Sequence, residues 1–219
     1  NIDDIYDLVN KEFITAIDLP IIAINGNHET YNFVRFLQSG GVAQDVLDID
    51  QFRILLYSPW KFVDNTVQMQ VTDSDYEFFK NNLSREKHNL VMVTDMVHHN
   101  EVDLPRWKDD IVPMLKQFDV RYVICGDNDW VDHRYSWVQL DNIQYIHQGI
   151  AHNLVVPNIN TFLEVQLYED GNLKFIPHTI PLDGLSDFYR MRNNEFIRKK
   201  PDNGLLRRLY KVFQHDKDN

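Results

Sequence analysis

The stretch Ile21-Ile-Ala-Ile-Asn-Gly-Asn-His-Glu-Thr30 decides how this chain is interpreted. Its apolar first half, behind Pro20, predicts a short buried strand, which breaks off into the polar turn Gly26-Asn27-His28-Glu29. Glycine lets the backbone approach a ligand closely, an Asn carboxamide oxygen is a hard metal ligand, and a His can donate a proton to an anion. The alternative is a tight strand-to-helix turn in which Asn and Gly supply unusual dihedral angles and the His is merely exposed.

Length and composition predict one folded domain of ordinary size. The 219 residues are 43% hydrophobic and 25% charged, which suits a chain with a real core and excludes a disordered one. A net charge of -11 argues against nucleic-acid binding, whereas carboxylates suit metal sites. The single Cys125 excludes an internal disulfide framework and a multi-cysteine zinc site. Neither a membrane span nor a signal peptide is visible, which leaves the compartment unknown and favours the cytoplasm.

The first half of the chain is predicted to form alternating helices and strands. The apolar spacing predicts a helix over 3–17, a strand over 20–25 and a helix that starts near Tyr31 and ends at Gly40-Gly41. Strands are predicted over 51–57 and 66–71, and Asp73 or Ser74 is expected to cap an amphipathic helix that follows.

Two further buried strands also end in polar loops. The run 89–94 leads through Asp95 into His98-His99, and the run 120–125 leads into Gly126-Asp127-Asn128-Asp129. Between them lies a predicted helix with Pro113 in its first turn or at a kink. Loops at the carboxyl ends of strands in a layered α/β protein meet in one crevice. We therefore expect the loops at 26–29, 95–100 and 126–129 to converge.

The last third predicts a hairpin and a basic tail. After a strand over 143–149, alternating runs at 161–168 and 173–177 flank a turn-rich tetrapeptide. Residues 190–211 hold eight Lys or Arg against two acidic residues, and the apolar spacing there predicts an amphipathic helix. That helix is expected to dock on the acidic body or on a subunit, or to lie on an anionic membrane.

The three loops, in this order and spacing, resemble the calcineurin-like metallophosphoesterase superfamily. Gly26-Asn27-His28-Glu29, the strand ending in His98-His99 and the strand ending in Gly126 correspond to its third, fourth and fifth motifs over residues 1 to about 150. The resemblance implies an α/β fold, a two-sheet β-sandwich flanked by helices that lacks its first βαβ portion. It also implies a metallophosphoesterase-like domain over 1–185, with 186–219 as the tail.

The resemblance assigns roles to individual residues. Asn27, His98, Asp127 and Asp129 would bind two divalent metal ions (Mn, Mg, Fe or Zn), and His28 would act on a phosphate-ester substrate as the acid. Paired divalent ions can ionise a water and neutralise phosphoryl charge, while a His can protonate the leaving oxygen. The chain is thus expected to be a metal-dependent hydrolase of phosphate mono- or diesters.

Two departures from the family pattern qualify this expectation. The fifth motif of the family is Gly-His-x-His, and here Asp127 and Asp129 stand where both histidines would be. Carboxylates are competent ligands that favour Mg, Mn or Ca. The first two motifs, Asp-x-His and Gly-Asp-x-x-Asp, would precede the first helix, so the sequence is either a fragment or a degenerate relative. Asp4 and Asp7 are interpreted as acids near a helix N-terminus.

Several alternatives remain open at this stage. Asp95 competes with His98 for the fourth-motif position. His99 is interpreted as a loop residue near the site, and His133 as part of a surface turn, although it lies close enough to replace a lost ligand. The competing functional class is a non-catalytic module with the same fold, whose basic tail contacts a membrane or a partner.

Overall fold

The computed structural model of the chain describes residues 20–95, 97, 104–126, 136–147 and 161–179. The helix expected over 3–17 and the basic tail lie outside these ranges. The chain divides into two compact units, of which the larger holds residues 24–33 and 42–180. In the smaller unit, the described residues are 20–23 and 34–41.

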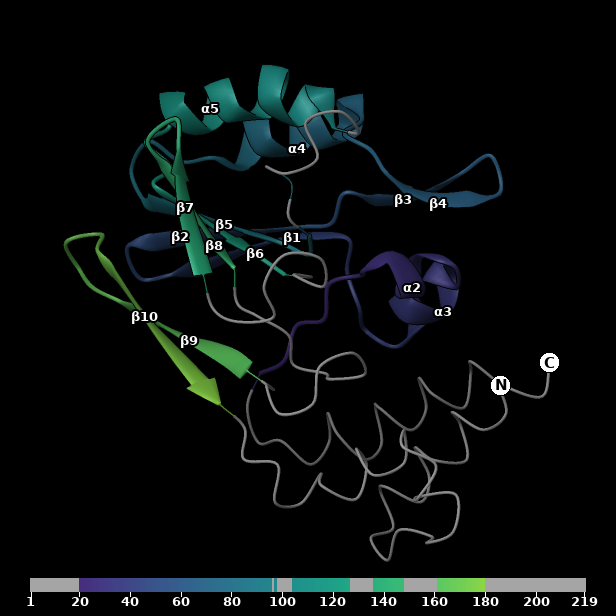
Figure 1. Cartoon of the computed structure of the whole chain (residues 1–219), viewed down its shortest axis with the longest axis horizontal. Helices are drawn as coiled ribbons and strands as arrows, with labels where there is room; N and C mark the ends of the chain where they lie inside the picture. The colour runs from purple at the N-terminus through teal and green to yellow at the C-terminus, as the bar shows by residue number, and fades with distance from the viewer. Residues whose placement is uncertain (1–19, 96, 98–103, 127–135, 148–160, 180–219) are drawn as a thin grey trace, which may run out of the picture. The chain divides into compact units, whose positions relative to one another are not determined.

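The larger unit is built on a six-stranded mixed sheet (Figure 1). The strands, in spatial order, are β1 (Gln44–Ile49), β2 (Phe52–Tyr57), β5 (His88–Val93), β6 (Tyr122–Cys125), β8 (Ile143–His147) and β7 (Ser136–Leu140). The four central strands run parallel, and β1 and β7 pair antiparallel at the two edges. The expectation of an α/β fold is confirmed.

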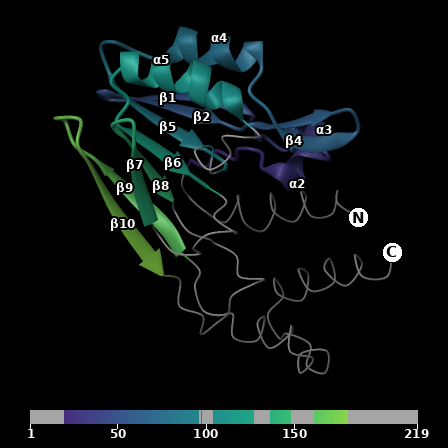
Figure 2. The same cartoon turned by 45° about the horizontal axis from the view of Figure 1, so that its top comes forward.

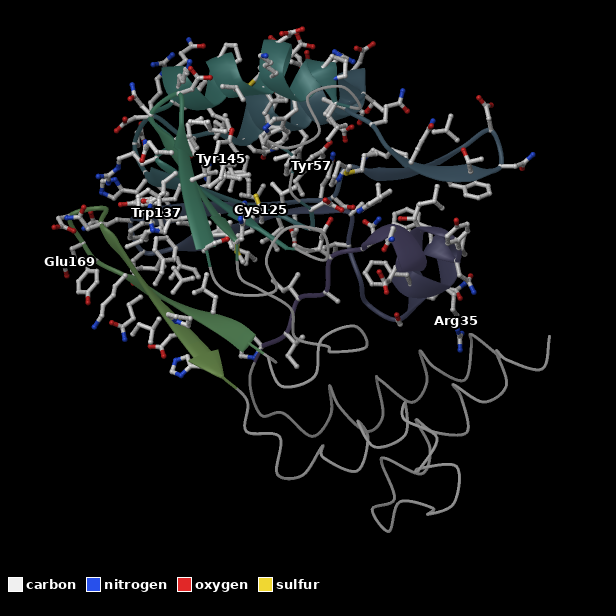
Figure 3. All side chains as sticks on the ribbon, in the orientation of Figure 1. Arg35, Tyr57, Cys125, Trp137, Tyr145 and Glu169 are labelled. Carbon is white, nitrogen blue, oxygen red and sulfur yellow. The ribbon has the colours of Figure 1, made fainter. Side chains whose placement is uncertain are left out.

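Helices cover one face of this sheet, as Figure 2 shows. They are α4 (Asp73–Asn82), the π-helical turn η3 (Trp107–Ile111) and α5 (Val112–Gln117). Pro113 lies in the first turn of α5, directly after the π-helical turn of η3, so the helix is irregular where the proline lacks its N–H. Tyr57 and Tyr145 fill the space between sheet and helices (Figure 3). The helix predicted around Trp107 is thus confirmed.

A two-stranded hairpin of β9 (Thr161–Leu167) and β10 (Leu173–Thr179) packs on the opposite face. Alternate residues of the central strands point to each face, so the parallel strands are buried on both sides. The buried residues on the hairpin side are Ile54, Leu56, Leu90, Ile124 and Ile146. The expected second sheet is therefore present as the predicted hairpin, which gives helices, sheet and hairpin as successive layers.

The described residues also form several smaller elements. The hairpin β3 (Trp60–Val63) and β4 (Thr66–Met69) leaves the end of β2 and contacts the short helix α2 (Asn27–Thr30). The helix α3 (Phe33–Gln38) ends as predicted, because Gly40 adopts a φ of 90° and Gly41 donates to Phe36 O at 3.1 Å. Among the described residues no helix is long and apolar enough to cross a membrane.

Two local predictions were wrong. The stretch 20–25 is not a buried strand: Ile21 and Ile22 are 38% and 40% exposed, and only Ile24 forms a β-bridge, to Val42. An apolar run becomes a buried strand only where partners line both its sides, which local sequence does not specify. The cap of α4 is Thr72, and not Asp73 or Ser74.

A buried carboxylate fixes the elements around the end of β2. Asp75 is 1% exposed and accepts hydrogen bonds from Thr72 N at 2.7 Å and from Lys61 Nζ at 3.0 Å. Gln44 Nε2 and the Thr72 hydroxyl also donate to it. Thr72 and Asp75 form a capping box at the start of α4. One carboxylate therefore joins β1, the β3–β4 hairpin and α4.

Removing this carboxylate should destabilise the fold strongly. We expect Asp75→Ala to lower the free energy of unfolding by about 3 kcal/mol, because it removes the ion-pair partner of Lys61, the acceptor of Gln44 and half of the capping box. The matched control Asp73→Ala, in the same helical turn but exposed, should cost less than about 1 kcal/mol. Urea unfolding measures both, and equal losses would contradict the role of Asp75.

Candidate functional site

The carboxyl ends of the parallel strands lie together at one edge of the sheet. Thr94, just after β5, donates its N–H to Tyr57 O at 3.2 Å and its hydroxyl to Ser58 Oγ at 3.3 Å. Gly126, just after β6, donates its N–H to Val93 O at 2.8 Å. The loops that start at Asp95 and Gly126 therefore leave the sheet side by side, as predicted.

The turn at Gly26-Asn27-His28-Glu29 is attached to the same edge. Asn25 N–H donates to Val42 O at 3.1 Å, and Ser58 N–H donates to the next carbonyl, Ala43 O, at 2.9 Å. Residues 42 and 43 thus lie between the turn and the end of β2. Backbone hydrogen bonds connect the beginnings of all three predicted loops across this edge.

Hydrogen bonds within the turn explain its shape. The Glu29 carboxylate accepts from Gly26 N–H at 2.9 Å, and the Thr30 hydroxyl donates to Gly26 O at 2.7 Å. Asn25, which is fully buried, donates its side-chain amide to the Thr30 hydroxyl at 2.8 Å. The backbone is therefore a tight turn that leads into a helix, Glu29 serves as its acceptor, and half-buried Asn27 begins helix α2.

Most of the predicted site residues lie outside the described part of the chain. This holds for His98, Asp127 and Asp129, for His99 and His133, and for the side chain of His28. Their roles remain predictions. Asp95, the alternative to His98, is described and is 8% exposed at the end of β5. Of the residues that sequence reasoning selected, the structure thus brings Asn27 and Asp95 to the same sheet edge.

Burial shapes the electrostatics at this edge. The pKa of the Cys125 thiol is raised far above its ordinary range, first because the thiol is fully buried and second because the Asp95 carboxylate lies near it. Figure 3 shows Cys125 on the sheet. Cys125 is therefore a neutral thiol at physiological pH and not a nucleophile.

Sequence reasoning missed His147, the last residue of β8. It is 4% exposed, and its ring nitrogen Nδ1 lies 2.9 Å from Ser136 Oγ. In the sheet, His147 is paired with Cys125 of the parallel strand β6 and with Ser136 of the antiparallel strand β7. A signal was available: His147 continues the alternation of Ile143 and Tyr145, so a polar side chain occupies a position that the pattern assigns to the core.

The donor types at this edge suit a divalent metal ion. Asn27 offers an amide oxygen, Asp95 a carboxylate and His147 an imidazole. Among the described residues, however, no three His, Cys, Asp or Glu side chains group closely enough to hold a metal ion. A metal centre at this edge would therefore need further ligands from loops outside the described ranges, such as those that carry His98 and Asp127.

Comparisons with known proteins do not establish a family. No family model matches the sequence, and no curated protein matches it. One similar solved structure is GAP50, the anchor in the inner membrane complex of Plasmodium, at a TM-score of 0.33 and 10% identity over 63% of this chain. The match spans about half of GAP50, 52% of that chain.

A second similar structure is a single mutant of Vps29 from Entamoeba histolytica. Its TM-score is 0.28 at 13% identity, over 81% of this chain and 88% of that one.

The role of Glu29 as the acceptor of the turn can be tested by stability. We expect Glu29→Ala to lower the free energy of unfolding by about 1 kcal/mol, because Gly26 N–H loses its acceptor. Glu29→Gln keeps an acceptor oxygen and should cost clearly less. Urea unfolding of the two variants decides, and equal losses would show that the charge of Glu29 matters and not its hydrogen bond.

The buried thiol predicts a pH dependence of stability. Because the pKa of Cys125 is raised in the folded chain, its contribution is fully present below the unfolded thiol pKa of about 8.5 and is lost as pH rises above it. The unfolded chain then ionises while the folded chain keeps its proton. Between pH values of about 8.5 and 10, wild type should lose up to about 1.4 kcal/mol more per pH unit than Cys125→Ala. Identical slopes in urea unfolding would contradict this.

Proposed function

We propose that this chain is a metal-dependent phosphoesterase that hydrolyses a phosphate mono- or diester. One observation carries the proposal: the turn at Asn27 and the loops that start at Asp95 and Gly126 are joined by backbone hydrogen bonds at one sheet edge. Loops that begin together can place oxygen and nitrogen donors from distant parts of the sequence around the same ions. The acidic composition of the chain supplies the carboxylates that such a site needs.

In this proposal the ligands are Asn27, His98, Asp127 and Asp129, with Asp95 as the alternative to His98. Two bound divalent ions would supply a hydroxide at neutral pH and neutralise charge on the phosphoryl group. His28 would donate its proton to the ester oxygen as the bond from that oxygen to phosphorus breaks and the bond from water to phosphorus forms. Glu29, through its bond to Gly26, would hold the turn that carries Asn27 and His28.

The second candidate is a non-catalytic binding module with the same fold. The observation that favours it is the replacement of both histidines of the fifth motif by Asp127 and Asp129. In such a module the basic segment 190–211 would contact an acidic partner or a membrane surface. The two candidates differ in metal-dependent turnover, which makes them separable in a single assay.

Activity of the purified protein, expressed with any residues that precede Asn1 in its gene, tests the first candidate. We expect Mn²⁺-dependent hydrolysis of an aryl phosphate, lost on addition of EDTA. His28→Gln should lower kcat by about 10²- to 10⁴-fold, because the leaving oxygen loses its acid. The control His178→Gln, in the β9–β10 hairpin, should leave kcat unchanged.

A second pair of variants examines the metal separately. Asn27→Ala should weaken Mn²⁺ binding in calorimetry, whereas Asn32→Ala, just beyond the same short helix, should not. Wild-type protein that neither binds a divalent metal nor turns over substrate would overturn the phosphoesterase and leave the binding module.

A further inference from the structure

We propose that two copies of this chain pair along strand β7 and form a symmetric antiparallel dimer, in which the six-stranded sheet of one copy continues into that of the other. Strand β7 is the last strand at one edge of the sheet, and among the described residues it pairs only with β8. The proposal concerns assembly and does not depend on the phosphoesterase activity.

The turn between β7 and β8 fixes which backbone groups of β7 face its partner strand. Asp141 and Asn142 form a two-residue turn with φ values of 53° and 64°, and Leu140 and Ile143 flank the turn as direct partners. Positive φ at both turn residues is typical of a type I′ hairpin. In such a hairpin the flanking pair exchanges both of its backbone hydrogen bonds. Leu140 therefore directs its N–H and C=O groups toward β8.

Trp137 and Gln139 direct their backbone N–H and C=O groups to the outer side of β7. Hydrogen-bonded pairs alternate along an antiparallel ladder, so Ser136, Val138 and Leu140 bond to β8 and the two residues between them do not. Among the described residues, none forms a hydrogen bond with these outward backbone groups. This edge is therefore an open template on which another strand can pair.

The opposite edge of the sheet is protected, whereas β7 is not. In β1 the Asp45 carboxylate accepts the N–H of Val46 at 2.8 Å, and Asp48 adds a second acidic side chain to the same strand. Charged side chains on an edge strand are a usual means of preventing it from pairing with another chain. Strand β7, with the sequence Ser-Trp-Val-Gln-Leu, contains neither a charged residue nor a proline. One edge of the sheet is thus left able to pair.

A second copy of β7 complements this edge in one register. With Trp137 of each copy opposite Gln139 of the other, every outward N–H and C=O group finds a partner, and the interface gains four hydrogen bonds. A shift of two residues in either direction pairs one of these residues only with itself and carries the other past the end of β7. The two-fold axis then passes between the two copies of Val138, as in any isologous interface. This self-complementarity favours a second copy over an unrelated peptide.

The side chains at this edge gain from pairing. Trp137 is 56% exposed and Leu140 is 40% exposed, so both bury apolar surface when a second strand is added. In the register above, Trp137 packs across Gln139 of the second copy. Asp141, which follows the strand, is paired with Lys116 Nζ at 2.9 Å. That ion pair reduces the repulsion at the interface between two chains that each carry a net charge of -11.

Sedimentation velocity over a range of protein concentrations tests the dimer. We expect wild type to sediment as a dimer that dissociates on dilution. Gln139→Pro should weaken the dimer at least about 10-fold, because it removes two of the four hydrogen bonds, whereas the lost N–H is not part of the β7–β8 ladder. The matched control Gln139→Ala keeps the N–H and should change the dissociation constant less than about 3-fold. A monomeric wild type, or a dimer that Gln139→Pro leaves unchanged, would overturn the proposal.

Hydrogen exchange of the wild-type protein decides the matter if Gln139→Pro fails to fold. The amides of Trp137 and Gln139 should exchange at least about 10-fold more slowly in the dimer than after dilution to the monomer. The amide of Val138, which bonds to β8, should stay protected at both concentrations. Fast exchange of Trp137 and Gln139 at every concentration would contradict the proposal. Slow exchange in a monomer would also contradict it, because another part of the chain would then cover the edge.

Discussion

The buried carboxylate of Asp75 is the constraint on which the candidate site depends. The carboxylate lies where β1, β3 and α4 come together. Gln44 of β1, Lys61 of β3 and Thr72, the N-cap of α4, each donate a hydrogen bond to it. Lys61 also donates to Ser58 O at 3.1 Å, which ties the carboxylate to the sheet edge. A charge buried this deeply is tolerated only when all its partners are present. The Asp75 network therefore holds Gln44, Ser58 and the start of α4 together beside the edge from which the loops leave.

The central strands could be predicted because both of their faces are buried. The runs 90–93 and 122–125 are continuously apolar, and that pattern belongs to parallel strands covered on two sides. The edge strands β1 and β7 escaped prediction for the opposite reason. Trp137 is 56% exposed and Ile49 is 45% exposed, so their apolar residues do not mark a buried face. They are strands because they pair with β2 and β8, and local sequence does not specify which segments will pair.

The candidate site was predictable in outline for a topological reason. Parallel strands present their carboxyl ends at one edge, so polar loops after successive strands must start together. The sequence predicts less well which side chains within a strand lie at that edge. His147 occupies a core position, and only the register with Cys125 and Ser136 reveals its place beside the loop. Asn25 likewise supports the turn from a buried position that the apolar pattern gave to a strand.

The central claim is that one edge of the sheet assembles a metal centre from three distant loops. The most direct measurement is a crystal structure of the protein soaked with Mn²⁺, with an anomalous difference map recorded at a wavelength where manganese scatters strongly. The claim predicts peaks at the carboxyl edge of β5 and β6, within ligand distance of Asn27 and of the loop after Gly126. Peaks elsewhere, or no peak in crystals that are fully soaked, would contradict it.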